Sequence, residues 1–210
     1  MLYYLLRYTI TPLARFLFSV RIMGRENLPK LAVLAANHSD NSDPVFLSMV
    51  TRRRIFFLAK HDVAEAVNKF IEWLVKSTGN VLIERGKGES QKAIDQAAEL
   101  IKKGYYFGIF PEGSTINKNY TFYKKEGHTG VARIALQARV PVVPIAIIGN
   151  KGLFPHKAIL PRFLSKSIVK IGKPLDFSEY YGRQNNKKIT RKVTDIIMKE
   201  IRNLEKSEKT

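Results

Sequence analysis

The sequence predicts an α/β fold: a single domain in which a mostly parallel central sheet is flanked by helices. From residue 31 onward, short apolar runs alternate with longer stretches of helical spacing, as in repeated βαβ units. Several runs are apolar throughout, which is typical of strands buried on both faces. With 210 residues, 45% of them hydrophobic, the chain is long enough to bury a core of its own.

The elements follow in order along the chain. The predicted strands are the apolar runs at residues 31–37, 54–60, 80–85, 105–110, 140–149 and 167–175. Helical spacing predicts helices at residues 63–79, 90–104, 129–138 and 189–206, and a further helix beginning at Pro44. In the helix at 90–104, Ser90 is the expected N-cap, and Lys102, Lys103 and Gly104 supply a cationic last turn and a glycine stop.

Residues 1–21 form an apolar segment that we expect to be a membrane-interfacial helical segment. A membrane span needs roughly 20 nearly uncharged residues, whereas Arg7, Thr11 and Arg15 would form one polar stripe on a helix. That pattern favours a helix lying in the membrane interface, and the alternative is a helix packed on the core. Pro12 is expected to split the segment and to begin a new helix. No small-residue cleavage site follows, so a secretory signal is not indicated.

The composition limits the classes of function. Lys and Arg number 36 against 18 Asp and Glu, a net charge of +18, which fits nucleic acid, an anionic membrane or a phosphorylated substrate as partner. The basic run 51–54 and the C-terminal helix are candidates for membrane contact, or are solvated charged faces. Cysteine is absent, so disulfides, thiolate metal sites and cysteine nucleophiles are excluded.

Other site types lack their sequence signals. His61, His128 and His156 show no metal-ligand spacing with a carboxylate, and neither a phosphate-binding loop nor a dinucleotide fingerprint is present. A basic nucleic-acid-binding module would use the same charge, but no zinc-finger, KH or RNA-recognition signature supports it. We therefore expect no metal and no nucleic acid.

Functional residues are expected just after the strands, because ligands of such sheets bind at the carboxyl ends of the strands. Four positions meet that description: Asn37-His38, Lys60, Glu84-Arg85 and Pro111-Glu112-Gly113.

The stretch LAVLAANHSDNSDPVFL places His38 five residues before Asp43. On a helix the two side chains would point about 140° apart, so they can meet only if the chain turns between them. The intervening SDNS supplies turn residues, and Pro44 starts a helix with Asp43 as its expected N-cap. Asp43 would then accept a hydrogen bond from one imidazole nitrogen and leave the other as a free base. By itself, the pattern is also typical of a turn histidine beside a helix cap.

Four blocks, taken in order, resemble the glycerophosphate acyltransferase superfamily, and most closely the lysophosphatidic acid acyltransferases. NHSDNSD is similar to the family's N-H-x-x-x-x-D, GNVLIERG to its second block, FPEGST to F-P-E-G-T-R-S and VPVVPIAI to V-P-[IV]-[IV]-P-V. The resemblance covers residues 22–175, and it identifies residues 22–210 as the acyltransferase domain. Two departures stand out: Glu84 replaces the usual aspartate, and Ile116 stands near the place of the usual third-block arginine.

The resemblance implies roles for individual residues. His38 is the general base toward the acceptor's hydroxyl, and Asp43 orients and stabilises its imidazolium. The residues implied to bind the acceptor are Arg85, Lys60, Glu112, Gly113 and Ser114. Of these, Arg85, helped by Lys60, is implied to bind the acceptor's phosphate, a task for which arginine's planar fork is suited.

The reaction implied is transfer of a fatty acyl group from acyl-CoA or acyl carrier protein to lysophosphatidic acid, without an acyl-enzyme. Glycerol phosphate or another lysophospholipid is the alternative acceptor. The thioester is a co-substrate, and no cofactor is expected. The partners implied are an anionic membrane surface, the lysophospholipid and the thioester donor. The expected location is peripheral or monotopic, on the cytoplasmic face of the cell membrane.

Overall fold

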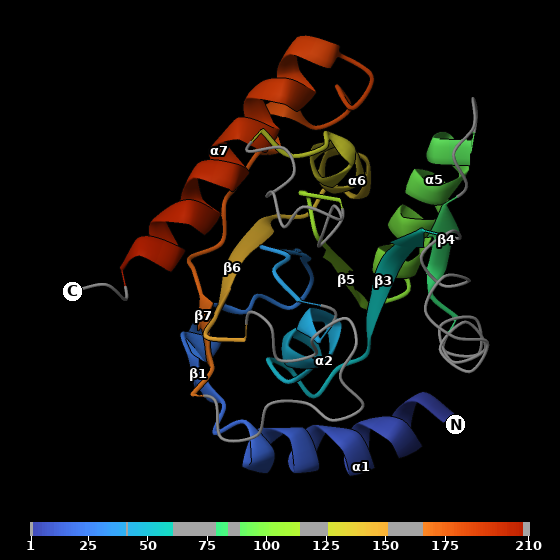
Figure 1. The fold of residues 1–210 in the computed structure, drawn as a ribbon. Coiled ribbons are helices and arrows are strands. Elements are labelled where there is room, and N and C mark those ends of the chain that lie inside the picture. The colour runs from blue at the N-terminus through green and yellow to red at the C-terminus, as the bar shows by residue number, and fades with distance from the viewer. Residues whose placement is uncertain are drawn as a thin grey trace.

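The computed structural model describes residues 2–40, 42–60, 79–83, 89–113, 126–150 and 166–207. Within them, a seven-stranded sheet lies between two layers of helices (Figure 1). The strands are β1 (Arg21–Met23), β2 (Val33–Ala36), β3 (Ile55–Lys60), β4 (Val81–Ile83), β5 (Tyr106–Ile109), β6 (Val142–Ile148) and β7 (Ile168–Ile171). The helices are α1 (Leu2–Leu17), α2 (Asp43–Ser48), α5 (Glu89–Lys102), α6 (Gly130–Ala138) and α7 (Lys187–Lys206), with short 3₁₀ turns at Arg25–Asn27 and Ser178–Tyr180.

The strands lie in the order β1-β7-β6-β2-β5-β3-β4. Every neighbouring pair is parallel except β6 and β7, which are antiparallel. The mostly parallel sheet is therefore confirmed. The edge strand β1 was not predicted, because it is only three residues long and its burial does not distinguish it from a loop.

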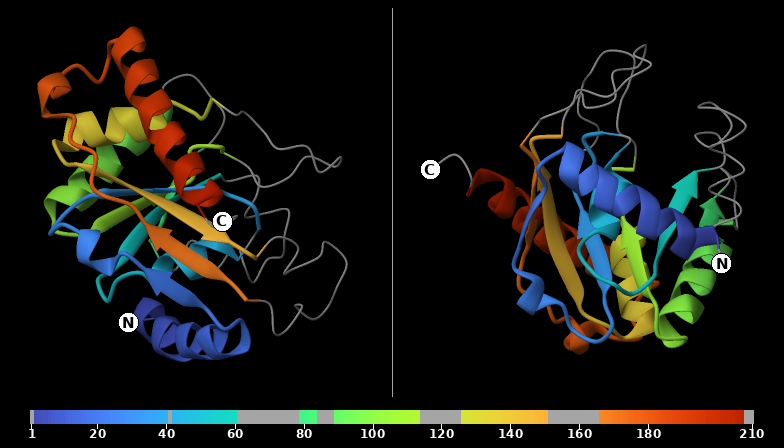
Figure 2. Two further views of the ribbon diagram at one scale, coloured as in Figure 1. Left: turned by 90° about the vertical axis from the view of Figure 1, so that its left-hand side faces the viewer. Right: turned by 90° about the horizontal axis from the view of Figure 1, so that it is seen from below.

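Both faces of the sheet are covered, as Figure 2 shows. On the central strand β2, Val33 and Ala35 pack into a core shared with α5, α6 and α7, whereas Leu34 and Ala36 pack into a second core with α2. Successive side chains of a strand point to opposite faces, so a strand covered on both sides has no polar position. This explains the continuous apolar run at β2.

The topology makes the carboxyl end of β2 the point at which the strand order reverses. Strands β5, β3 and β4 lie on one side of β2, and β6, β7 and β1 lie on the other. Between β5 and β6 the chain crosses from one side of β2 to the other, and ligands of open α/β sheets bind at the carboxyl edge beside such a reversal of strand order. The segments that follow β2, β5 and β6 therefore converge there.

Several predicted boundaries were wrong. α1 runs unbroken from Leu2 to Leu17 with Pro12 inside it; both Pro12 and Tyr8, whose carbonyl loses its helical donor, are exposed to water. α2 begins at Asp43 with Ser42 as N-cap, one residue earlier than predicted. α5 begins at Glu89, which places Ser90 inside the helix. The predicted helix 63–79 lies outside the described residues apart from Gly79.

In the part of the chain that the structure describes, no helix combines the length and apolar character that crossing a membrane requires.

Candidate active site

The end of β2 is held by the side chain of Asn37. Its amide nitrogen donates to the Ile147 carbonyl at 2.9 Å, and its amide oxygen accepts from the Ile147 N–H at 2.7 Å. The Asn37 side chain thus continues the pairing of β2 with β6 beyond the last strand residue. The next residue, His38, leaves the sheet at a fixed position on its carboxyl edge.

His38 and Asp43 are in direct contact. Nδ1 of His38 lies 2.8 Å from Oδ2 of Asp43, with the Asp43 side chain fully buried and the His38 side chain 17% exposed. Because an ionised carboxylate can only accept hydrogen bonds, Nδ1 carries the proton and Nε2 is left unprotonated in the neutral ring. The predicted contact between the imidazole and the carboxylate is therefore confirmed.

The Asp43 carboxylate accepts hydrogen bonds from four donors. Besides the imidazole, Oδ2 accepts the backbone N–H groups of Ser39 at 2.7 Å and Asp40 at 2.9 Å, and Oδ1 accepts from the side-chain amide of Asn150. These bonds close the turn between His38 and the start of α2. They also explain why Asp43 is not the N-cap, since its side chain turns back toward the preceding loop rather than into the helix.

Glu112, which follows the neighbouring strand β5, contacts the turn that begins at His38. Its Oε2 accepts the backbone N–H of His38 at 3.1 Å. The pKa of Glu112 is raised to about 7, mainly by burial and also by the nearby carboxylates of Glu205 and Asp43, while the bond from His38 and the charge of Arg202 act to lower it. Glu112 is thus a carboxyl group that titrates near neutral pH beside the histidine.

The aromatic and glycine residues around Glu112 set the shape of this edge. The Phe110 ring stacks on the imidazole of His38, with ring centroids 4.3 Å apart and planes 19° apart. Gly113 has φ of +83°, and a Cβ there would lie 2.6 Å from a ring carbon of His128. Only glycine fits that backbone and that close approach.

Of the remaining predicted residues, some lie within the described part of the chain and others lie outside it. Lys60 is the last residue of β3, where it pairs with Ile83 of β4, so its backbone lies at the carboxyl edge. Arg85 comes two residues after β4, outside the described residues, and Ser114 likewise lies outside them. The structure brings together His38, Asp43, Glu112 and Gly113.

Two residues of the site were not predicted from the sequence. Asn150 is fully buried, and besides its bond to Asp43 its Oδ1 accepts from the Ser39 hydroxyl at 3.0 Å. It lies two residues after the end of β6, so the rule that selects residues after strands could have found it. Glu205, near the end of α7, accepts from the Asn37 amide at 2.8 Å, and no local signal in the sequence points to it. Burial raises the pKa of Glu205.

The arrangement is suited to proton transfer. Asn150, His38 and Glu112 follow three adjacent strands, β6, β2 and β5. They lie together at the carboxyl ends of these strands. The imidazole is oriented from one side by a buried carboxylate, and its second nitrogen is available as a general base.

Asn150→Ala should lower the free energy of unfolding by about 1–3 kcal/mol, because it leaves the fully buried Oδ1 of Asp43 without its amide donor. Urea denaturation of parent and variant measures the loss. Asn203→Ala, which removes an exposed amide that bonds Glu200, is the matched control and should change stability by less than about 0.5 kcal/mol. Equal stabilities for the two variants would contradict the role given to Asn150.

Glu112→Gln should change how stability depends on pH. Between the ordinary glutamate pKa of 4.5 and about 7, the folded protein keeps a proton that the unfolded chain has lost, so this group lowers stability as pH rises through that window. The advantage of the glutamine variant over the parent should therefore grow from about pH 4.5 to pH 7 and then level off. Denaturation at several pH values tests this, with exposed Glu126→Gln as control. Parallel curves for parent and Glu112→Gln would refute it.

Comparison with known proteins identifies relatives of this chain. Residues 19–148 match the family model described as Acyltransferase. A probable 1-acyl-sn-glycerol-3-phosphate acyltransferase of Mycoplasma pneumoniae is 29% identical over 150 residues, 68% of this chain and 54% of that protein. A lyso-ornithine lipid O-acyltransferase of Pseudomonas aeruginosa is 32% identical over 131 residues, 62% of this chain and 47% of that protein.

A solved structure agrees with these matches. The crystal structure of the 1-acyl-sn-glycerophosphate acyltransferase of Thermotoga maritima superimposes with a TM-score of 0.57 at 25% identity, covering 89% of this chain and 73% of the other. The chain spans about half the length of the two curated relatives above. Since the family match covers more than half of the chain and includes His38, Asp43 and Glu112, the chain belongs to the acyltransferase family.

Proposed function

We propose that the protein is a 1-acylglycerol-3-phosphate O-acyltransferase, which moves a fatty acyl group from a thioester donor to the free hydroxyl of lysophosphatidic acid and forms phosphatidic acid. The observation that carries this proposal is the imidazole of His38, held through Nδ1 by buried Asp43 at the carboxyl edge of the sheet. The names of the Mycoplasma and Thermotoga relatives support the same acceptor.

In the proposed mechanism, Nε2 of His38 takes the proton of the acceptor's hydroxyl as its oxygen attacks the thioester carbonyl. The tetrahedral intermediate expels the thiolate as the carbon–sulfur bond breaks, and the imidazolium returns the proton to that sulfur. Asp43 stabilises the imidazolium in between, as the carboxylate of a catalytic triad does. The attack is direct, so no acyl-enzyme forms and no cofactor is needed.

The acceptor's phosphate is proposed to lie beside the segments that follow β3 and β4. Lys60 pairs with Ile83 across these strands, so Arg85, two residues further on, is close enough in sequence to share that edge. Glu112, Gly113 and Ser114 would complete the acceptor site. A carboxyl group with a pKa of about 7 repels a phosphate less than an ordinary glutamate would.

A second possible acceptor is lyso-ornithine lipid. The Pseudomonas relative is named for lyso-ornithine lipid, and the third block of this chain has Ile116 near the place of the usual arginine. A product assay on vesicles, offering acyl-CoA and acyl carrier protein separately against lysophosphatidic acid, lyso-ornithine lipid and glycerol phosphate, decides among the acceptors.

The membrane contact is proposed to be α1, within an interfacial segment of residues 1–21 that precedes the acyltransferase domain at 22–210. Its exposed face carries Tyr4, Tyr8, Leu13 and Phe16, the last two 57% and 82% exposed. Arg15 and Arg52 lie close enough to Arg25 to lower its pKa, after the larger effect of burial. Apolar side chains beside clustered cations suit a peripheral contact with an anionic membrane, proposed here to be its cytoplasmic face.

His38→Ala should lower the rate of acyl transfer to lysophosphatidic acid by about 10²–10⁴-fold, the usual contribution of a general base. Turnover with a radiolabelled thioester measures it, and circular dichroism checks the fold. His156→Ala, a histidine outside the four blocks, serves as control. A purified His38→Ala protein that turned over at the parent rate would remove the general-base assignment.

Arg85→Ala should raise KM for lysophosphatidic acid more than about tenfold with a smaller effect on kcat, because it removes a bidentate phosphate contact. The KM for the thioester donor should stay the same. Exposed Arg183→Ala is the control. An unchanged KM for the acceptor would show that Arg85 does not bind its phosphate.

The double variant Tyr8→Ser/Phe16→Ser should weaken binding to anionic vesicles by at least about tenfold, since each side chain contributes apolar area to the interface. Co-sedimentation with vesicles measures it. Ile196→Ser, which removes an exposed apolar side chain from α7, should bind as the parent does. Equal loss in the two proteins would argue against α1 as the contact.

A further inference from the structure

The inward-facing stripe of α7 ends on a carboxyl group. Buried side chains recur along this helix every three or four positions, as in any helix that packs one face on a sheet. They are Thr190, Val193, Thr194, Ile197, Met198 and Ile201. Glu205 follows Ile201 by four residues, so it falls on the same face one turn further on. A position at which the pattern predicts an apolar side chain therefore carries a carboxyl group.

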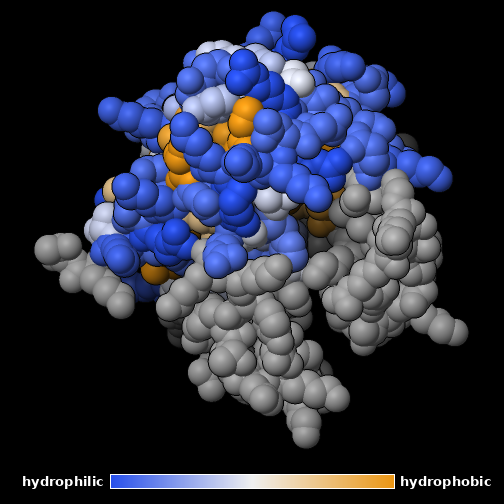
Figure 3. Space-filling view, turned by 90° about the horizontal axis from the view of Figure 1, so that it is seen from above, coloured by the Kyte–Doolittle hydropathy of each residue, from blue (hydrophilic) through white to orange (hydrophobic). Residues whose placement is uncertain are grey.

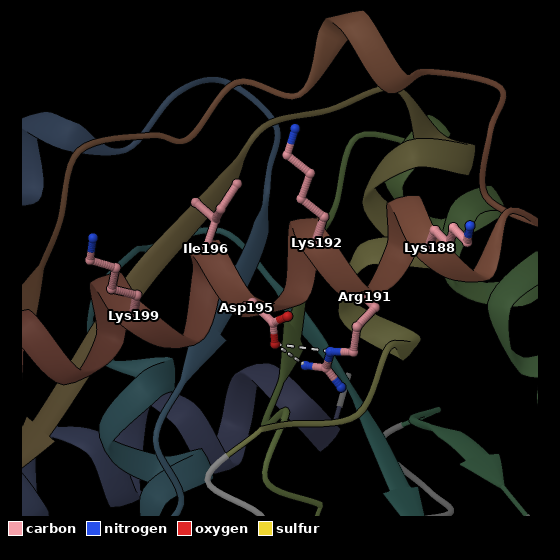
Figure 4. Close-up of a pocket in the computed structure, with 6 residues that line it drawn as sticks. All are labelled: Lys188, Arg191, Lys192, Asp195, Ile196 and Lys199. Atoms are coloured by element: carbon pink, nitrogen blue, oxygen red, sulfur yellow. Dashed lines mark hydrogen bonds and ion pairs between the residues drawn. The ribbon is translucent and has the colours of Figure 1, made fainter.

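The solvent-facing side of α7 is different in character. Figure 4 labels six residues of the helix that line a surface hollow: Lys188, Arg191, Lys192, Asp195, Ile196 and Lys199. The side of the molecule that carries α7 is largely hydrophilic, with a few hydrophobic residues among the charged ones (Figure 3). Exposed Ile196 precedes Glu205 by nine residues, which places the two about 180° apart around the helix. Glu205 is thus turned toward the protein and away from this charged surface.

Two local rules disfavour a carboxylate at Glu205. The side chain is half-buried, and burial raises its pKa, while the bond from Asn37 and the charge of Arg202 act to lower it. Glu205 also lies in the last turn of α7, which ends at Lys206, and the dipole of a helix favours cations over carboxylates there. A residue that breaks local rules points to a functional site, so the contacts of Glu205 indicate its role.

Glu205 completes the hydrogen bonding of the Asn37 amide. The amide nitrogen of Asn37 donates to Oε1 of Glu205 at 2.8 Å and to the Ile147 carbonyl at 2.9 Å. Its two N–H groups thus have two acceptors, one on α7 and one on β6. Asn37 is only 4% exposed, so without Glu205 a buried N–H group would lose its partner, which is costly. The amide is therefore fixed between a strand and a helix.

The residue that follows Asn37 is the proposed base, His38. Its backbone N–H is held by Glu112 and its ring by Asp43, so the Asn37 amide is the last contact that fixes the chain before the imidazole. Glu205 supplies the part of that contact that comes from outside the sheet. Misplacing a reacting group by about 1 Å can lower a rate by about 100-fold, so a loosened Asn37 would be felt at the reaction.

We propose that Glu205 is a positioning residue for acyl transfer, which fixes the Asn37 amide and through it the place of the His38 imidazole. This inference rests on the proposed function. It adds to the site a residue of α7 that lies outside the four sequence blocks and outside the family match at residues 19–148. Glu205 acts through Asn37 and takes no part in the proton transfer itself.

The kinetic test compares Glu205→Leu and Glu205→Gln with the parent. Leucine continues the apolar stripe of α7 but cannot accept from Asn37, so kcat should fall by at least about tenfold. The KM values for acceptor and donor should stay within about twofold, because no substrate contact is lost. Glutamine keeps an acceptor oxygen and should hold kcat within about threefold of the parent. Circular dichroism checks the fold of each variant.

A control and a second measurement separate positioning from stability. Ile201→Val removes a buried methylene one turn earlier on the same stripe, so it should lower the denaturation midpoint and leave kcat within about twofold of the parent. NMR then follows the proton on Nδ1 of His38, assigned by its loss in His38→Gln. In Glu205→Leu this proton should exchange with water at least about tenfold faster than in the parent, and in Glu205→Gln and Ile201→Val at the parent rate.

The outcomes separate the role of Glu205 from the proposed function. If the parent transfers no acyl group to any acceptor, the proposed function fails, while the exchange rates still report on the positioning of His38. A parent kcat or a parent exchange rate in Glu205→Leu would overturn the role given to Glu205. Equal losses of kcat in Glu205→Leu and Ile201→Val would assign Glu205 to stability alone, and equal losses in the leucine and glutamine variants would show that the bond to Asn37 is not the cause; both results overturn the proposal.

Discussion

The structure of the site depends on one buried carboxylate. The Asp43 side chain accepts hydrogen bonds from the His38 ring, two backbone N–H groups and the Asn150 amide, and it has no exposure to water. A buried charge is tolerated only when its hydrogen bonds are satisfied. The four donors meet that need, and in doing so they fix the turn, the start of α2 and the orientation of the imidazole together.

The sheet supplies those donors from distant parts of the chain. Because β2 lies between β6 and β5, residues that follow these strands, Asn150 and Glu112, reach the His38 turn from both sides. α7 reinforces the same point through Glu205 and Asn37. Chemistry confined to one end of three parallel strands leaves the two helical layers free for other contacts. In our proposal, α1 meets the membrane.

Much of this could be predicted from local sequence. Apolar runs predicted six of the seven strands, and the turn residues between His38 and Asp43 predicted their contact. What the sequence could not predict depends on neighbours in space. Asn150 becomes a partner of Asp43 only because β6 pairs with β2, and Glu205 reaches Asn37 across 168 residues. The N-cap was misplaced because Asp43 has better partners upstream, and Pro12 does not break α1 because the helix is exposed there.

The central claim is that Asp43 holds the proton on Nδ1 of His38 and leaves Nε2 as the base. Nitrogen-15 NMR of the histidine rings tests it most directly, with the His38 signals assigned by their loss in His38→Gln. At a pH where the ring is neutral, the account predicts a protonated Nδ1 and an Nε2 shift typical of an unprotonated nitrogen. A neutral ring protonated on Nε2 would contradict the account.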